Sequence, residues 1–352
     1  MRKSLYNVLL LIISFFSTLS MSAQSSSSGT TAFDFLNFPS SARVAALGGS
    51  SLAMPDSDIT LTLANPSLIS ADNHNQIGLS FVDYYSDVNY GFAQFGRTFN
   101  KLGSFVGTMQ FVNYGTFTRM TSQEVNQGTF GANELALNIG WGRRLDSSFS
   151  IGANVKGIYS SFESYSASGL AVDVAGTWHL TDYNFMMSLI AHNIGIQLTN
   201  YTTGTTEKLP FELQLAMSKR LAHVPLTFSV VLTNLQNWDL AYESQYSTEV
   251  DPFTGETRTT GGLSGFADEL MRHVIIGAEL QPFKSFRLQV AYNYQTRQEM
   301  KIVDKVSTVG FSWGFGFRVY GFSFSYARAT NHLSGSPNYV TLTTNLGEAF
   351  KK

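Results

Sequence analysis

The segment GFSWGFGFRVYGFSFSYA, residues 310–327, alternates between large apolar residues and small or polar ones. This period of two predicts a β-strand with one bulky face and one small face, because successive strand residues point to opposite sides. After Tyr320-Gly321 the alternation begins again, which predicts a tight hairpin. On the bulky parity lie Phe311, Trp313, Phe315, Phe317 and Val319, followed by Phe322, Phe324 and Tyr326.

The same period continues almost without a break from Gln76, and it predicts about fourteen strands. Most are longer than strands of soluble proteins and reach the ~9–11 residues that cross a bilayer at a tilt. Residues 185–198, FMMSLIAHNIGIQL, are ambiguous because both parities carry apolar residues. The predicted strands lie near 76–86, 88–99, 102–117, 130–143, 148–162, 165–180, 184–198, 209–220, 225–238, 271–282, 285–297, 304–318, 320–329 and 337–346.

The links between these strands alternate between short turns and longer loops, which is the layout of an outer-membrane barrel. We therefore predict an all-β fold, a transmembrane antiparallel β-barrel of about 14 strands whose aromatic face meets lipid. The rival interpretation is a secreted β-sandwich or β-helix, which has no use for so many long one-sided strands or so much exposed aromatic surface.

The polar face of the strands carries charges of both signs, which lipid disfavours but a hydrated lumen tolerates. Three of these residues, Glu134, Lys156 and Asp173, lie on adjacent predicted strands and are candidates for a salt bridge or for contact with a plug. The predicted lumen charges are Glu134, Lys156, Asp173, Glu212, Glu279, Arg287 and Arg318.

Composition supports an exported membrane protein. Only 14% of the residues are charged, well below the ~25% of soluble domains. Arg2 and Lys3 precede a short apolar run, residues 8–16, so residues 1–23 are predicted to be a signal peptide. A single anchored helix is the alternative, although the run is shorter than a span. The net charge of −2 provides no field for nucleic acid, and the chain has no cysteine.

Residues 24–31 are predicted to be a flexible leader, and residues 32–75 lack the long alternation of the barrel strands. A barrel of this size leaks unless it is filled. We therefore predict that residues 32–75 form an N-terminal hatch, with Arg43, Asp56 and Asp58 paired to lumen charges of opposite sign. Residues 76–352 are the predicted barrel.

No motif for catalysis, metal binding or a cofactor is recognisable. The six histidines have no ligand spacing, and the lumen carboxylates are more typical of structural pairs than of general acids or bases. The chain is therefore predicted not to be an enzyme and to use no cofactor. The histidines are His74, His179, His192, His223, His273 and His332.

The opening of the mature chain resembles a known family. FLNFPSSAR (residues 35–43), ALGG (46–49) and NPSL (65–68) are similar to the start of the PorV/PorQ family, FadL-like outer-membrane barrels of the type IX secretion system of Bacteroidetes, with the closest likeness on the PorQ side. The corresponding hatch residues are Arg43, Gly48, Gly49, Asn65 and Pro66. Ser67 departs from the Asn-Pro-Ala of FadL-type proteins.

The resemblance implies a non-enzymatic anchor for a surface attachment complex. Its partners would be PorZ, PorU and PorV, and the complex would process cargo and attach it to lipopolysaccharide. The alternative is a FadL-type transporter of small hydrophobic molecules. With the long loops outside the cell, the longest loop, residues 239–270, is the candidate partner-docking loop, with Tyr246 and Phe253 as aromatic anchors.

Overall fold

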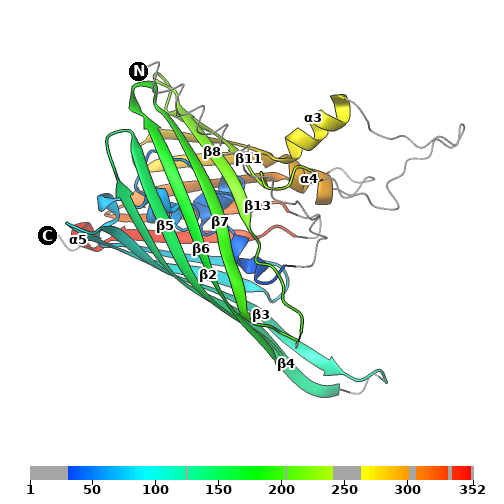
Figure 1. Cartoon of the computed structure of the whole chain (residues 1–352). Helices are drawn as coiled ribbons and strands as arrows, with labels where there is room; N and C mark the ends of the chain where they lie inside the picture. Colours follow the sequence, from blue (N-terminus) through cyan, green and yellow to red (C-terminus); the bar gives the residue numbers. More distant parts are fainter. Residues whose placement is uncertain are drawn as a thin grey trace, which may run out of the picture. The chain divides into compact units, whose positions relative to one another are not determined.

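The computed structural model describes residues 31–123, 126–202, 204–240, 263–300, 307–331 and 335–349. Residues 1–30, the docking-loop residues Tyr246 and Phe253, and His332 lie outside the described residues. Within them, fourteen antiparallel strands pair in chain order, and β1 pairs with β14 to close a barrel (Figure 1). The predicted fold class is confirmed.

The strands are β1 (Gln76–Asp83), β2 (Asn89–Phe99), β3 (Gly103–Met120), β4 (Asn126–Arg144), β5 (Phe149–Phe162), β6 (Tyr165–Leu180), β7 (Phe185–Thr199), β8 (Glu212–Arg220), β9 (Leu226–Leu232), β10 (Val274–Phe283), β11 (Phe286–Asn293), β12 (Phe311–Val319), β13 (Phe322–Ala329) and β14 (Asn338–Asn345). The helices are α2 (Ala42–Ala46), α3 (Leu263–Arg272), α4 (Tyr294–Met300) and α5 (Leu346–Ala349), with 3-10 turns η1 (Asp34–Asn37), η2 (Ile59–Leu61), η3 (Pro66–Leu68), η4 (Ala71–Asn73) and η5 (Thr181–Tyr183). No helix in the described ranges is long and apolar enough to cross a bilayer.

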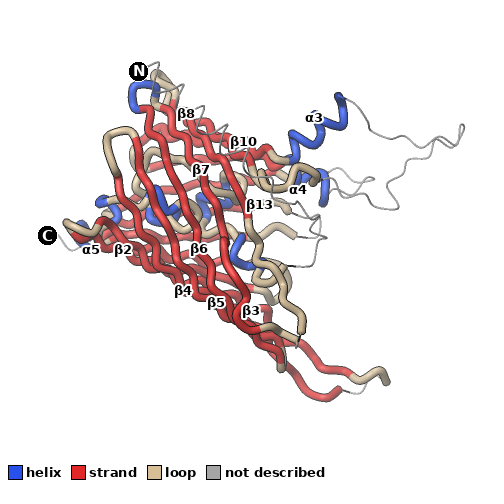
Figure 2. The backbone as a smooth tube through the Cα atoms, in the orientation of Figure 1, coloured by secondary structure: helices blue, strands red, loops and turns tan. Residues whose placement is uncertain are grey.

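The two ends of the barrel differ. The end that holds the start of β1 and the end of β14, together with α5, has short turns such as Tyr320-Gly321 between its strands. We call it the terminal end. The opposite end, which we call the distal end, carries longer connections, among them those with α3 and α4 (Figure 2).

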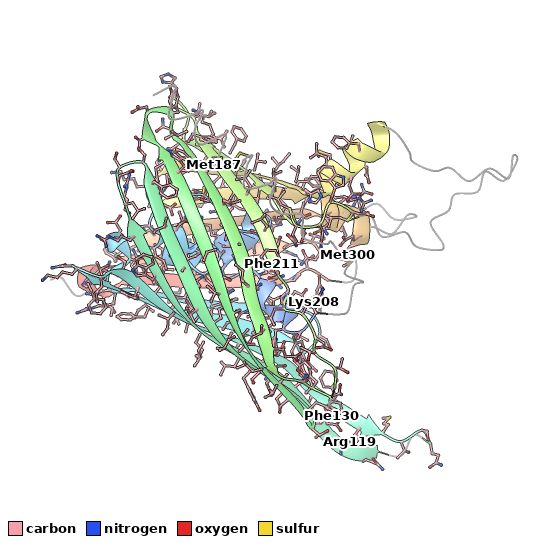
Figure 3. The ribbon with its side chains drawn as sticks, in the orientation of Figure 1. Arg119, Phe130, Met187, Lys208, Phe211 and Met300 are labelled. Atoms are coloured by element: carbon pink, nitrogen blue, oxygen red, sulfur yellow. The ribbon has the colours of Figure 1, made fainter. Side chains whose placement is uncertain are left out.

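Two predicted distal loops are corrected by the structure. The link predicted at residues 118–129 is mostly strand, because β3 runs to Met120 and β4 starts at Asn126. These strands project as a hairpin whose Phe117 and Phe130 rings stack at 5.4 Å (Figure 3). The loop predicted at residues 239–270 contains helix α3. The strand predicted at residues 285–297 is also shorter than expected, because β11 ends at Asn293 and the chain continues as helix α4.

Residues 31–75 lie inside the barrel, where the ribbon of Figure 1 is blue. The segment begins by pairing its Thr31 with Lys208 and then folds into α2 and four short 3-10 turns. Its caps are local: Ser41 accepts a hydrogen bond from Val44 N, and Asn65 accepts one from Ser67 N. Such caps satisfy amide groups that are far from water.

The inward-facing residues of the strands are small because residues 31–75 pack directly against them. A Cβ at Gly314 would lie 2.7 Å from the Ala46 Cβ, and one at Gly152 would lie 2.1 Å from the Pro66 carbonyl oxygen. The bulky parity faces outward, as predicted: Phe311 is 48% exposed and Trp313 is 47% exposed. An outward face of this kind is typical of contact with lipid.

The distal half of the interior is apolar, which differs from the polar lumen that the sequence predicts. Phe38 of the N-terminal segment packs against Tyr84 and Tyr90 with ring centroids 5.7 and 4.8 Å apart. Tyr90 in turn contacts Phe92 and Tyr339, 6.0 and 6.4 Å away. The sequence pattern does not reveal this layer, because alternation alone does not distinguish an aromatic residue that faces the interior from one that faces lipid.

Candidate functional site

Arg43 joins the N-terminal segment to the barrel wall. It lies on α2 and is 2% exposed, and its guanidinium donates to both oxygens of Glu279 on β10, from Nε at 2.9 Å and from Nη2 at 2.8 Å. The same guanidinium contacts Asp56 at 2.5 Å and Asp58 at 3.3 Å. A buried guanidinium is planar and donates in fixed directions, so it holds α2 in one position against β10 and also neutralises the carboxylates.

The cluster continues to a second cation. Arg287 on β11 lies 3.6 Å from the Asp58 carboxylate, and Gln289 donates to Glu279 at 3.0 Å. Asp56 retains 40% exposure of its side chain. Its partial burial raises its pKa, but the neighbouring Arg43 guanidinium outweighs this effect and lowers the pKa to about 2. Asp56 is therefore ionised at neutral pH.

A second buried cluster lies on β5, β6 and β7. Lys156 Nζ contacts Asp173 Oδ2 at 2.9 Å and donates to Asn193 Oδ1 at 2.8 Å. His192 Nδ1 lies 3.7 Å from Asp173 Oδ1, and its Nε2 lies 2.8 Å from the hydroxyl of Ser51 in the N-terminal segment. The cluster therefore also links the wall to residues 31–75.

The order Ser51, His192, Asp173 resembles a nucleophile, base and carboxylate, but the contacts are structural. The Ser51 hydroxyl donates to the Ala64 carbonyl oxygen at 2.6 Å, and its amide donates to Gln214 Oε1 at 3.1 Å. Asp173 is already paired with Lys156. A nucleophilic serine needs a free path to a carbonyl group and donors for the oxyanion, and this serine is only 2% exposed.

Asn193 forms a bulge in β7. Its φ of 55° is left-handed, its amide donates to Asp173 Oδ1 at 2.8 Å, and the pairing of β6 with β7 shifts between Val172 and Val174. Its side-chain amide reaches Asn37 of the N-terminal segment at 2.8 Å. The Lys156–Asp173 cluster therefore holds the bulge in place.

The barrel wall is incomplete beyond this bulge. The pairing of β7 with β8 ends at His192 and Glu212, whereas β7 continues to Thr199 with β6 as its partner. After an exposed stretch at residues 204–206 the chain turns inward at residues 207–211 instead, where Leu209 is buried and Lys208 pairs with Thr31 (Figure 3). On its outer face the unpaired part of β7 carries exposed Ile194, Ile196 and Leu198.

A shallow cavity of about 270 Å³, wide open to the outside, lies beside this part of the wall, at the distal end. Phe162 and Tyr201 meet edge to face with centroids 5.8 Å apart, and the Tyr201 hydroxyl donates to Ser160 at 2.6 Å. Burial raises the pKa of Tyr201 to about 12, so this hydroxyl stays neutral. The residues that line the cavity are Phe162, Tyr165, Tyr201, Thr202 and Glu207.

The remaining predicted lumen charges are more scattered than the sequence suggests. Glu134 is separate from Lys156 and Asp173 and accepts a hydrogen bond from the Tyr114 hydroxyl, so the predicted trio is a pair. Glu212 accepts from the amide of Asn234 at 3.3 Å. Arg318 lies on the inward parity of β12, and its side chain is exposed near the terminal end, where it donates to Ser323 at 3.0 Å.

The predicted hatch residues have structural contacts. Gly48 and Gly49, with φ of 103° and 85°, end α2, and a side chain at Gly48 would collide with Ile275. Asn65 donates to the Leu52 carbonyl and to Ser188 on β7, both at 3.0 Å. Pro66 starts η3. No group of three metal-binding side chains occurs in the described parts of the chain.

Comparison with known proteins places the fold. A mutant of the TodX monoaromatic hydrocarbon channel is 13% identical to this chain with a TM-score of 0.50, covering 88% of this chain and 98% of the channel. The chain shares the barrel fold of this channel.

Two further solved structures are similar. The toluene transporter TodX of Pseudomonas putida is 12% identical with a TM-score of 0.49 and coverages of 89% and 98%. A FadL homologue of Pseudomonas aeruginosa is 11% identical with a TM-score of 0.47 and coverages of 87% and 98%. No family model matches the sequence, and no curated protein matches it.

Proposed function

We propose that this chain is a FadL-type outer-membrane barrel that binds small hydrophobic molecules at its distal end and releases them sideways through its wall. The observation that carries the proposal is the aromatic cavity next to the part of β7, residues 193–199, that has no β8 partner. In this proposal residues 1–23 are the signal peptide, both termini are periplasmic, and the distal end faces the cell exterior.

The chemistry of the cavity favours a small apolar ligand. Phe162, Tyr165 and Tyr201 offer ring faces and edges, and Glu207 supplies the one charge among the lining residues. Aromatic walls favour apolar rings and chains. The volume of about 270 Å³ is just below the range of pockets for drug-sized ligands, which begins at ~300 Å³. The similar TodX structures are described as a monoaromatic hydrocarbon channel and a toluene transporter.

The path away from the cavity follows the incomplete wall. One side of the path is residues 193–199 of β7, and the other is the inward segment 207–211, where Leu209 provides an apolar surface. Residues 32–75 are proposed to be the hatch that closes the straight path through the lumen, since Arg43 and Ser51 attach them to the wall at two strands, β10 and β7. A hydrophobic molecule that leaves sideways enters the bilayer directly.

Ligand binding tests this proposal. Purified barrel in detergent is titrated with a fluorescent naphthalene derivative. Tyr201→Ala removes one wall of the cavity, and we expect an affinity loss of about tenfold, the equivalent of ~1.4 kcal/mol for a lost aromatic contact. The control is Tyr183→Ala, because Tyr183 is 61% exposed and lies in the turn η5 at the terminal end. Equal affinities for the two variants, or no saturable binding to the parent protein, would contradict the proposal.

A second candidate function is the membrane anchor of the type IX surface attachment complex. It is favoured by one observation, the similarity of residues 35–43, 46–49 and 65–68 to the PorV/PorQ family. The partners would be PorZ, PorU and PorV, with lipopolysaccharide as the acceptor of cargo. The β3–β4 hairpin and helices α3 and α4 give the distal end protruding surface that could contact such partners.

The two candidates predict different results for one change. Residues 249–262 are replaced by a short Gly/Ser linker, which removes the middle of the predicted docking loop, Phe253 included, and leaves α3 intact. An anchor should then release PorZ into the medium of the native host while the barrel stays inserted. A transporter should keep its affinity for the naphthalene probe. Retention of PorZ, with cargo attachment at its normal level, would rule out docking through this loop.

A further inference from the structure

Helix α3 is amphipathic. On the surface of a water-soluble protein the polar side of such a helix faces solvent, whereas in α3 the apolar side is the exposed one. Among its residues 265–272, the exposed positions are all apolar: Phe266 is 55% exposed, Leu270 40% and Met271 37%, and Ala267 is exposed beside them. At 100° per residue these four positions span one arc of the helix. Such an arc normally faces a protein core.

The polar arc of α3 faces the protein instead. Asp268 accepts hydrogen bonds from the Tyr294 hydroxyl of α4 at 2.5 Å and from Arg272 Nε at 2.9 Å. Glu269 accepts one from the amide of Leu240 at 2.5 Å. The helix is therefore held with its charged side toward α4 and residue 240, and this orientation directs its apolar side away from them.

The apolar arc is continuous with the lipid-facing surface of the barrel. α3 ends at Arg272, and β10 begins two residues later at Val274, with Ile276 46% exposed on its outer face. Trp238, half exposed, stacks on Phe266 at 5.4 Å and on His273 at 5.3 Å, which ties the helix to the end of the strand. Tryptophan is typical of the boundary between headgroups and acyl chains.

We propose that α3 lies in the membrane interface at the distal end, with Phe266, Leu270 and Met271 inserted among the lipid acyl chains and Trp238 at the headgroup level. Lipid is the occupant that fits, because it covers the adjoining outer face of β10 and requires no partner of specific shape. In this proposal helix α3 contacts lipid in addition to the outer faces of the strands. The proposal depends on the barrel fold and is independent of what the barrel transports or anchors.

The absence of cysteine makes a clean test available. Single cysteines replace Met271, Phe266, Ile276 and Glu299 in turn, and each is labelled with a nitroxide after reconstitution in phosphatidylcholine vesicles. Collisions with oxygen, which concentrates in hydrocarbon, are compared with collisions with a water-soluble nickel chelate. Ile276 is the lipid reference on β10, and Glu299 is an exposed, charged reference on α4.

We expect labels at positions 271 and 266 to show an oxygen-to-nickel collision ratio close to that at position 276 and several-fold above that at position 299. Met271→Cys tests the helix even if Phe266→Cys disturbs the stack with Trp238. A ratio equal to that at position 299 would show that the face meets water and would overturn the proposal. Low collision rates with both reagents would also overturn it, because they would show a face covered by protein.

Discussion

Arg43 receives its three acidic partners from two separate stretches of the chain. Asp56 and Asp58 come from the same N-terminal segment, whereas Glu279 comes from β10, 236 residues further along the sequence. Burial of a guanidinium costs several kcal/mol, and only complete pairing offsets that cost. The cluster is therefore best understood as a device that fixes one position of the segment, with little net gain in stability.

Replacement of Arg43 by methionine should loosen the N-terminal segment. The variant leaves Glu279 and Asp58 without their main cation, at a cost of about 3–5 kcal/mol for a broken buried pair. Amide hydrogen exchange of residues 40–60 should become faster than in the parent protein. Arg318→Met is the matched control, since Arg318 is exposed near the terminal end. Similar exchange in both variants would mean that the cluster does not hold the segment.

Acid should weaken the contact between Asp56 and Arg43. The pKa of Asp56 is lowered to about 2 in the folded protein, compared with ~3.9 in an unfolded chain. The stabilisation by this carboxylate is therefore fully present above about pH 4 and is lost as the pH falls toward 2. Exchange of residues 40–60 should accelerate in that window in the parent protein. The Asp56→Asn variant should show no such acceleration between pH 5 and 2. If the parent protein shows none either, the prediction is wrong.

At the scale of the element, the bulge at Asn193 explains the one strand that the sequence left ambiguous. Before the bulge the outward residues of β7 are at odd positions, as with Leu189, and after it they are at even positions, as with Ile194 and Ile196. A one-residue insertion moves the side chains to the opposite face. The bulge therefore explains why the outward apolar residues change parity within this strand, whereas Met186 and Ile190 are apolar because they face the buried interior.

The conformation of Asn193 makes a matched pair of variants informative. Asn193→Gly keeps a residue that adopts positive φ and loses the side-chain bonds to Lys156 and Asn37. Asn193→Val loses those bonds and also strains the backbone, which costs about 1–3 kcal/mol more. We expect the urea midpoint of the folded barrel to fall further for valine than for glycine. The reverse order would show that the left-handed turn is not required.

The barrel strands could be predicted from sequence because the alternation is local, but the contacts between elements could not. Nothing near Arg43 in the chain indicates that Glu279 is its partner, and the inward Tyr90 and Phe92 have the composition of lipid-facing residues. Helices α3 and α4 were missed because two to three turns of helix within a polar stretch are hard to distinguish from a loop in a sequence dominated by period two.

At the scale of the molecule, the N-terminal segment should decide whether the barrel conducts. Deletion of residues 32–70 removes the contacts of Arg43 and Ser51 but leaves all the pairings between strands intact. The variant should still insert, and it should show a larger single-channel conductance in planar bilayers and a lower thermal midpoint. Unchanged conductance together with an unchanged midpoint would contradict a hatch role for the segment.

The uneven height of the barrel wall has a consequence for the membrane around it. β9 has 7 residues, whereas β4 has 19. With a rise of ~3.3 Å per residue and a tilt of ~40°, β9 spans about 18 Å, less than the ~25 Å apolar band of an outer-membrane barrel. Such hydrophobic mismatch thins the adjacent bilayer at a modest cost per ångström. The molecule therefore sits in a lopsided annulus of lipid, compressed beside β9 and of normal thickness beside β4.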